Sequence, residues 1–199
     1  MAQKTTRNAE PTNEKETQQL KSFLQKGAAT RIDEIDQFAG PAGVIANLGQ
    51  PVTVPYRVDS AELDARVRQA EDNQTLLTIA IDRVVAATDC LVRVFINKDD
   101  ADERTPLDDS HYLTTIAFFC HDAGGEGGRD FTCQVGEEAT TALRYRFNIT
   151  RLLRDSGAFR KGEPGVTFVV VPVEGRQPRT AAVSVASTEL RLVKSVVRR

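Results

Sequence analysis

The residues best suited to chemistry lie in one stretch of the chain, HYLTTIAFFCHDAGGEGGRDFTC. Cys120, His121 and Cys133 supply two thiols and an imidazole, which are ligand types that zinc and soft copper ions prefer. Cys120 and His121 adjoin the end of a predicted strand, however, and adjacent strand residues point to opposite faces. We therefore favour apolar buried cysteines and a histidine at the rim over a metal site, and we predict no cofactor.

The chain contains only two imidazoles, His111 and His121. Neither lies in a recognisable nucleophile elbow, so the sequence does not support a hydrolase. The glycine-rich segment AGGEGGRD precedes FTCQV, which has the pattern of a strand, whereas a phosphate-binding loop needs a helix N-terminus after its glycines. We interpret this segment as a flexible hairpin loop, and we predict that the chain is not an enzyme.

The segment NKDDADERTPLDDS concentrates carboxylates between two strong strand patterns. Five aspartates there have the chemistry to surround a hard cation such as calcium. They are Asp99, Asp100, Asp102, Asp108 and Asp109. The spacing is not that of an EF-hand, and we interpret the segment as a solvated loop built from turn residues.

The composition excludes several classes of protein. The 199 residues are 40% hydrophobic and 27% charged, and 26 basic side chains face 28 acidic ones, so nothing indicates nucleic-acid binding. No apolar stretch approaches the roughly 18 residues of a membrane span, and the N-terminus lacks the apolar core of a secretory signal. Three cysteines at irregular spacing suit a reducing compartment, so we expect a cytoplasmic protein.

Strand patterns dominate the chain after residue 51. PVTVPYRV has the features of an edge strand, and seven further segments are apolar or alternating: TLLTIAIDRVV, CLVRVFIN, HYLTTIAFF, RDFTCQV, TALRYRFNIT, GVTFVVVPV and AAVSVASTELRLV. In CLVRVFIN, Val92, Val94 and Ile96 should share one face. We predict a mainly β fold, an antiparallel β-sandwich of about seven strands over residues 51–199. ITRLLRDSGAF should add one short helix over its open end, and SAELDARVRQAEDNQ a weak helix capped by Ser60, or else a polar linker.

The first 50 residues have a different character. Residues 1–15 are polar and lack periodicity, so we expect a disordered tail. Residues 16–50 should form a helical arm followed by a Gly/Pro-rich connector, GPAGVIANLGQP. The arm contains two apolar sets at helical spacing. They are Leu20, Phe23 and Leu24, then Ile32, Ile35 and Phe38 in RIDEIDQF, which we expect to form one or two helical turns.

Five motifs occur in a recognisable order between about residues 75 and 193. VRVFIN leads into KDDADERTPLDD, and there follow HYLTTIAFFCH, FNITRLLRDSGA, GVTFVVVPV and AVSVASTELRLV. This order resembles the C-terminal β-domain of the tyrosinase and polyphenol oxidase family, type 3 copper proteins related to the hemocyanins. The catalytic domain of that family holds two coppers with six histidines. Only two histidines are present here, so the resemblance implies the non-catalytic part.

The resemblance implies a function through protein contact. In full-length relatives this domain packs over the entrance to the copper site and can insert a placeholder side chain there. Tyr112, Phe118 and Phe119 lie in the corresponding region, although aromatic residues on strands are more often core residues. We expect the chain to cover or scaffold a protein partner, most naturally a tyrosinase-like copper domain on another chain.

Other interpretations remain open. The amphipathic segment with Leu20, Phe23 and Leu24 needs a surface to cover, and it is a candidate docking arm. Polar arms also exchange between identical subunits, so a structural subunit that forms a homo-oligomer is the main alternative. A carrier of a metal ion bound by Cys120, His121 and Cys133 is a third.

Overall fold

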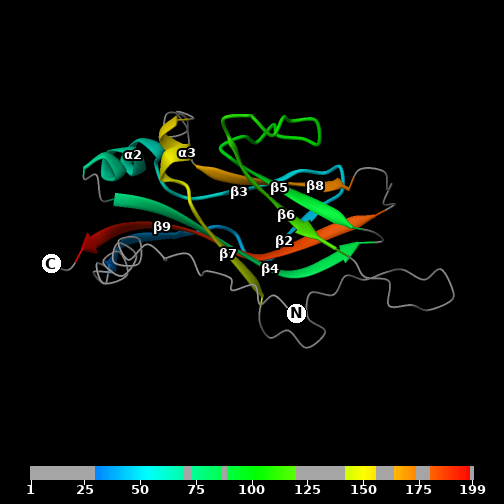
Figure 1. Cartoon of the computed structure of the whole chain (residues 1–199), viewed down its shortest axis with the longest axis horizontal. Coiled ribbons are helices and arrows are strands. Elements are labelled where there is room, and N and C mark those ends of the chain that lie inside the picture. The colour runs from blue at the N-terminus through cyan, green and yellow to red at the C-terminus, as the bar shows by residue number, and fades with distance from the viewer. Residues whose placement is uncertain are drawn as a thin grey trace, which may run out of the picture.

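Two antiparallel sheets packed face to face form the body of the molecule in this computed structural model (Figure 1). The structure describes residues 30–69, 73–86, 89–119, 142–155, 164–173 and 180–197. Sheet A contains β1 (Thr30–Ala39), β2 (Val44–Asn47), β9 (Ala181–Val197), β4 (Asn73–Ala86) and β7 (Leu143–Asn148). Sheet B contains β3 (Val52–Pro55), β8 (Gly165–Pro172), β5 (Cys90–Ile96) and β6 (Tyr112–Phe118). The predicted antiparallel β-sandwich is confirmed.

The strand order places terminal strands of both sheets at each of the two lateral edges of the sandwich. In sheet A the order is β1, β9, β4 and β7, with β2 also pairing with β9, and in sheet B it is β3, β8, β5 and β6. β9 pairs with β4 along one side, while β1 and β2 share its other side in succession. β1, β2 and β3 therefore lie at one lateral edge, where β2 contacts β3, and β6 and β7 are the other terminal strands of the two sheets.

The helical turns predicted for RIDEIDQF are wrong, because these residues belong to strand β1. β1 pairs antiparallel with β9, and the register shifts between Glu34 and Asp36, which makes Ile35 the extra residue of a β-bulge. Ile35 is consequently exposed, and Phe38 packs against the core. The connector predicted after it contains a further strand, β2, so both β1 and β2 belong to sheet A.

The inner faces of the two sheets form one hydrophobic core. The alternation predicted for β5 is confirmed, since Val92, Val94 and Ile96 are all buried in that core. β8 is buried along almost its whole length, with Phe168 and Val170 in the main core. A strand covered on both faces has no need of polar alternation, which explains the continuous apolar run GVTFVVVP.

Two short helices close one end of the sandwich (Figure 1). α2 (Ser60–Arg68) inserts Leu63 and Val67 into the core, and α3 (Thr150–Asp155) inserts Leu153. The helix predicted over the open end is therefore confirmed. The predicted N-cap of α2 is corrected by one residue: Oδ1 of Asp59 accepts a hydrogen bond from the Glu62 amide at 2.9 Å, which is the usual geometry of a cap.

Several predictions fall outside the described residues. These include the polar tail over residues 1–15, the helix with Leu20, Phe23 and Leu24, the glycine-rich loop AGGEGGRD and the strand RDFTCQV. Among the residues that are described, no helix is both long and apolar enough to span a bilayer.

Candidate functional site

The three aromatic residues predicted as contact candidates on β6 occupy different environments. Phe118 is buried in the main core. Tyr112 is half-buried and packs edge-on against Phe95, with ring centroids 5.6 Å apart. Phe119 follows the last residue of β6 and is 66% exposed, so it alone of the three presents most of its ring to solvent. The other candidates, Leu20, Phe23 and Leu24, lie outside the described residues.

The candidate metal ligands Cys120, His121 and Cys133 also lie outside the described residues. The ranges that the structure does describe contain no group of three or more histidine, cysteine or carboxylate side chains placed to hold a metal ion. Cys90, at the start of β5, is fully buried as a free thiol. Burial, and secondarily the charge of Asp89, raise the pKa of the Cys90 thiol to about 11, so it remains protonated near neutrality.

The acidic segment after β5 is a folded loop in which turn residues bind one another. Oδ1 of Asp102 accepts hydrogen bonds from the Arg104 amide at 2.9 Å and from the Thr105 hydroxyl at 3.1 Å. The Arg104 amide is the main cause of the lowered pKa of Asp102. Nζ of Lys98 lies 3.1 Å from Asp100 and 3.7 Å from Asp109. These contacts support the interpretation of the segment as a turn-rich loop.

The acidic loop is anchored to the outer side of sheet B. Ala101 packs with Phe95, Val169 and Val171 in a second, smaller apolar cluster. At the base of the loop, Asn97 has a positive φ of 53°, and its Oδ1 accepts a hydrogen bond from the Gly165 amide at 2.6 Å. The loop therefore serves as a lid over sheet B and explains why β8 is buried on both faces.

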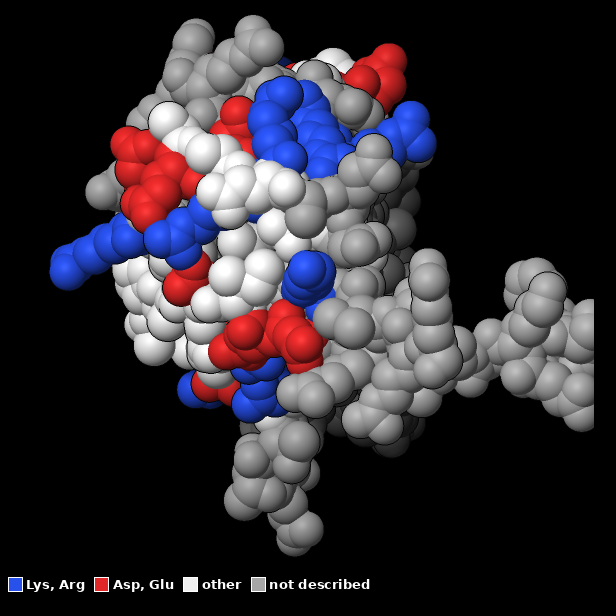
Figure 2. All heavy atoms as spheres, turned by 90° about the vertical axis from the view of Figure 1, so that its left-hand side faces the viewer, with Lys and Arg blue, Asp and Glu red and all other residues white. Residues whose placement is uncertain are grey.

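Charges of both signs are mixed at the end of the sandwich that carries the helices (Figure 2). Arg66 of α2 forms ion pairs with Asp36 of β1 and, at 2.5 Å, with Glu62 one turn earlier in the helix. Arg68 pairs with Asp64 at 2.7 Å. The described charges on this face therefore do not form a field of one sign that would attract a polyanion.

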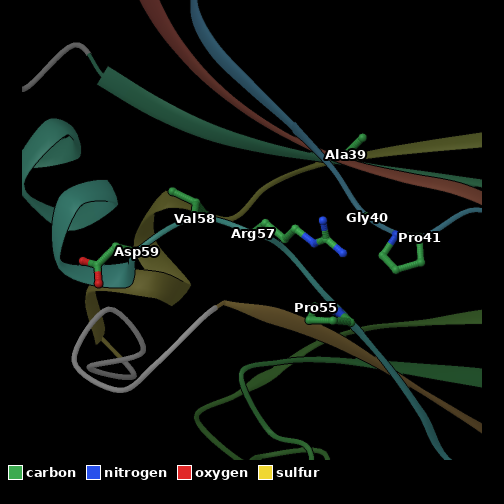
Figure 3. Close-up of a pocket in the computed structure, with 7 residues that line it drawn as sticks. All are labelled: Ala39, Gly40, Pro41, Pro55, Arg57, Val58 and Asp59. Carbon is green, nitrogen blue, oxygen red and sulfur yellow. The ribbon is translucent and has the colours of Figure 1, made fainter.

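An open cleft of about 890 Å³ lies between the ends of the two edge strands β1 and β3. The described residues of its lining come from two short segments: Ala39, Gly40 and Pro41 on one side, and Pro55, Arg57, Val58 and Asp59 on the other. The guanidinium of Arg57 extends toward the two prolines, while the carboxylate of Asp59 points toward α2 (Figure 3). The sequence prediction identified PVTVPYRV as an edge strand, but it did not single out Arg57.

The backbone around the cleft is held closely on both sides. The Tyr56 amide donates to the Pro164 carbonyl at 2.8 Å, and the Val58 amide donates to the Tyr56 carbonyl at 2.8 Å. The Tyr56 side chain is buried in the core, and burial raises the pKa of its hydroxyl. Arg57 is thus an exposed residue between two anchored neighbours.

Gly40 permits the close approach of the two edge strands. A Cβ atom at this position would overlap Oγ1 of Thr188 and would lie 2.5 Å from Cγ1 of Val54. The Gly40 amide donates to the Thr188 carbonyl at 3.0 Å, which fixes the end of β1 on β9. The floor of the cleft is consequently close-packed, with no space for a larger residue.

Comparison with known proteins gave structural neighbours only. No protein-family model matches the chain, and no curated protein matches it. A solved structure of recombinantly expressed latent aurone synthase, a polyphenol oxidase, is similar with a TM-score of 0.41 and 15% sequence identity, over 86% of this chain and 29% of that one. Latent aurone synthase from its natural source gives a TM-score of 0.36 with 17% identity, over 78% of this chain and 25% of the other. The chain thus spans less than a third of the length of these polyphenol oxidases.

Proposed function

We propose that this chain is a non-catalytic β-sandwich that covers or scaffolds a protein partner, most naturally a tyrosinase-like copper domain on a separate chain. The observation that carries the proposal is the order of the five motifs along the sequence. In the structure these motifs fall on successive parts of one sandwich: β5 with its acidic loop, β6, β7 with α3, β8 and β9.

The count of histidines supports a role without copper catalysis. The whole sequence contains two, His111 and His121. Nδ1 of His111 lies 2.7 Å from the Ile96 carbonyl, so the ring is engaged at the base of the acidic loop. These 199 residues alone do not contain the six histidines that hold a copper pair of that type.

Phe119 is the residue that we propose for the partner contact. Phe119 is 66% exposed, and covering the rest of its ring would contribute about 1–2 kcal/mol. Exposed aromatic side chains at the end of a rigid strand are frequent anchors of protein interfaces. The preceding residue, Phe118, is buried in the core, and it fixes the backbone from which Phe119 projects.

The test is to mix the purified chain with a tyrosinase-like copper domain from the same source. We expect a complex of defined mass in size-exclusion chromatography with light scattering, and a changed rate of phenol oxidation by the copper domain. Phe119→Ser should weaken the complex about ten-fold or more. Leu107→Ser is the matched control, because Leu107 is 50% exposed on the acidic loop and should leave the affinity unchanged.

Three results would count against this proposal. Phenol oxidation by the isolated chain would contradict a non-catalytic role. If no copper oxidase of the source organism binds the chain, the proposed partner is wrong. A large, regular homo-oligomer of the chain alone would favour the alternative of a structural subunit.

A further inference from the structure

We propose that the cleft between β1 and β3 is a binding site for a carboxylate group, with Arg57 as its cation. The inference concerns the lateral edge opposite to β6, and it stands independently of the proposed copper-domain partner. The ligand class is an organic acid with an apolar flank. Such a carboxylate can belong to a free aliphatic acid or to an acidic side chain of a peptide.

The charge of Arg57 is available for a ligand. Within the described ranges, Arg57 has no recorded ion pair, whereas Arg66, Arg68 and Arg191 each pair with a carboxylate. The nearest acidic residue of the lining, Asp59, already accepts the Glu62 amide as the cap of α2. Its carboxylate also points away from the Arg57 guanidinium (Figure 3).

The geometry of a guanidinium selects the chemistry of the ligand. Its planar fork of N–H donors matches the two oxygens of a carboxylate, and charge-assisted pairs of this type are the stronger hydrogen bonds in proteins. The N-terminus of the nine-residue helix α2 begins at the same lining, but the Asp59 carboxylate already caps it. The guanidinium fork of Arg57 is therefore the feature that points to a negatively charged group.

The two prolines decide how such a ligand is held. Pro41 and Pro55 line the cleft at the ends of the two edge strands, and neither residue has a backbone N–H to donate. A peptide that pairs as an added strand depends on main-chain donors, so these positions disfavour that mode. The proline rings instead offer apolar walls, and recognition falls to the Arg57 side chain.

The backbone on both sides of Arg57 is held in place before any ligand binds. Tyr56 is buried on one side of it, and the amide of Val58 on the other side is hydrogen-bonded to the Tyr56 carbonyl. A preformed site loses less conformational entropy on binding than a mobile one. Because the backbone around Arg57 is held in place, only its side chain has to be ordered when a ligand binds.

The experiment is a titration of the ¹⁵N-labelled full chain, followed by NMR at the Arg57 side-chain Nε–Hε and at the Gly40 and Val58 amides. The two probes are glutarate and the blocked peptide Ala-Pro-Glu-Ala-Ala, and the same peptide with Gln in place of Glu is the uncharged comparison. We expect saturable shifts at these three groups with glutarate, with the Glu peptide or with both. Saturation by glutarate alone identifies a free acid as the ligand, and saturation by the peptide alone identifies an acidic segment.

Three variants distinguish specific binding in the cleft from nonspecific attraction of anions to surface arginines. Arg57→Gln should weaken binding about ten-fold, the loss expected for one charge-assisted pair. Arg57→Lys keeps the charge without the fork and should lose about three-fold. Arg146→Gln removes another exposed arginine, on the strand β7, and should leave the affinity unchanged.

Two outcomes would overturn the inference. One is the absence of saturation with either acid. The other is equal binding by the wild type and Arg57→Gln, or by the Glu and Gln peptides. Matching thermal unfolding of the variants and the wild type establishes that the fold is intact, as expected for an exposed side chain.

Discussion

The two lateral edges of the sandwich are protected from further strand pairing by different means. At one edge β1 and β3 end beside Pro41 and Pro55, which lack backbone donors. At the other edge β6 and β7 contain no proline, and β7 exposes Arg144 and Arg146 instead. Both devices oppose the aggregation of edge strands. Pro41 and Pro55 remove backbone donors where β1 and β3 end and leave side chains to recognise a ligand there, whereas β6 and β7 keep their backbone donors.

This difference separates the two proposed sites. Arg57 lies at the proline edge, where Pro41 and Pro55 line the cleft beside it and its guanidinium is the group that we assign to recognition. Phe119 lies at the arginine edge, directly after a strand whose one described neighbour is β5. A small acidic ligand suits the first edge, and a protein surface suits the second.

The largest expected effect concerns the close packing of the proline edge. Gly40→Ala should lower the free energy of unfolding by about 3 kcal/mol, because its Cβ would overlap Oγ1 of Thr188. Gly43→Ala is the control: Gly43 has a φ of +67° and no atom within 4 Å of the added Cβ. That change should cost about 1 kcal/mol from backbone strain alone. Urea unfolding measures both, and equal losses would show that the edge is loosely packed.

A second pair of variants compares hydrogen bonds at the two edges. Oγ1 of Thr150, after β7, accepts the buried Thr75 amide at 2.7 Å. Thr150→Val leaves that amide without a partner and should cost about 2 kcal/mol. On β3, the Thr53 hydroxyl lies 2.8 Å from the Thr167 hydroxyl. Thr53→Val should cost only about 1 kcal/mol, because a hydroxyl can rotate to another acceptor. A larger loss at Thr53, measured by urea unfolding, would reverse the ranking.

Cys90 reports on whether the β6 edge stays closed. It pairs with Phe118 of β6, and burial raises the pKa of its thiol to about 11 from an ordinary 9.0. A raised thiol pKa contributes stability that is complete below pH 9 and is lost as the pH rises through 11. In the Cys120→Ser and Cys133→Ser background, urea unfolding should therefore show falling stability above pH 9. Cys90→Ala should abolish that component of the pH dependence.

Reaction with a thiol reagent tests the same edge kinetically. In that background the folded chain should react with a disulfide reagent at pH 8 far more slowly than the unfolded chain, because the thiolate is the reactive form. Phe118→Ala should accelerate the reaction by opening the strand beside Cys90. Rapid reaction of Cys90 in the chain with Phe118 intact would mean that β6 separates from β5 and does not hold Phe119 in a fixed position.

Much of the fold could be predicted because alternation along a strand survives in the sequence. Val92, Val94 and Ile96 of β5 show it without interruption, and all three are buried. β1 could not be identified in this way, because the bulge at Ile35 adds one residue and brings Ile35 and Phe38 to a spacing of three. That spacing imitates a helix, and only the distant partner β9 determines the strand.

The site was less predictable than the fold for a related reason. Arg57 occupies an ordinary exposed position in an alternating segment, and nothing local distinguishes it. Its significance depends on Gly40 and Pro41, which reach it only because β1 and β3 end at the same lateral edge. The sequence pattern groups Phe119 with Tyr112 and Phe118, and only the strand register shows that their exposures differ.

The smallest effect on stability, and the most direct test of the comparison, comes from removing the charges of the arginine edge. Arg144→Thr combined with Arg146→Thr should change the free energy of unfolding by no more than about 0.5 kcal/mol, because both side chains are exposed and no ion pair is recorded for either in the described ranges. The double variant should nevertheless self-associate at lower concentration, since β7 would then present its edge without charge. Light scattering measures this, and Pro55→Thr is the matching change at the other edge. If neither variant self-associates more than the wild type, the prolines and arginines do not protect the two edges from pairing with other chains.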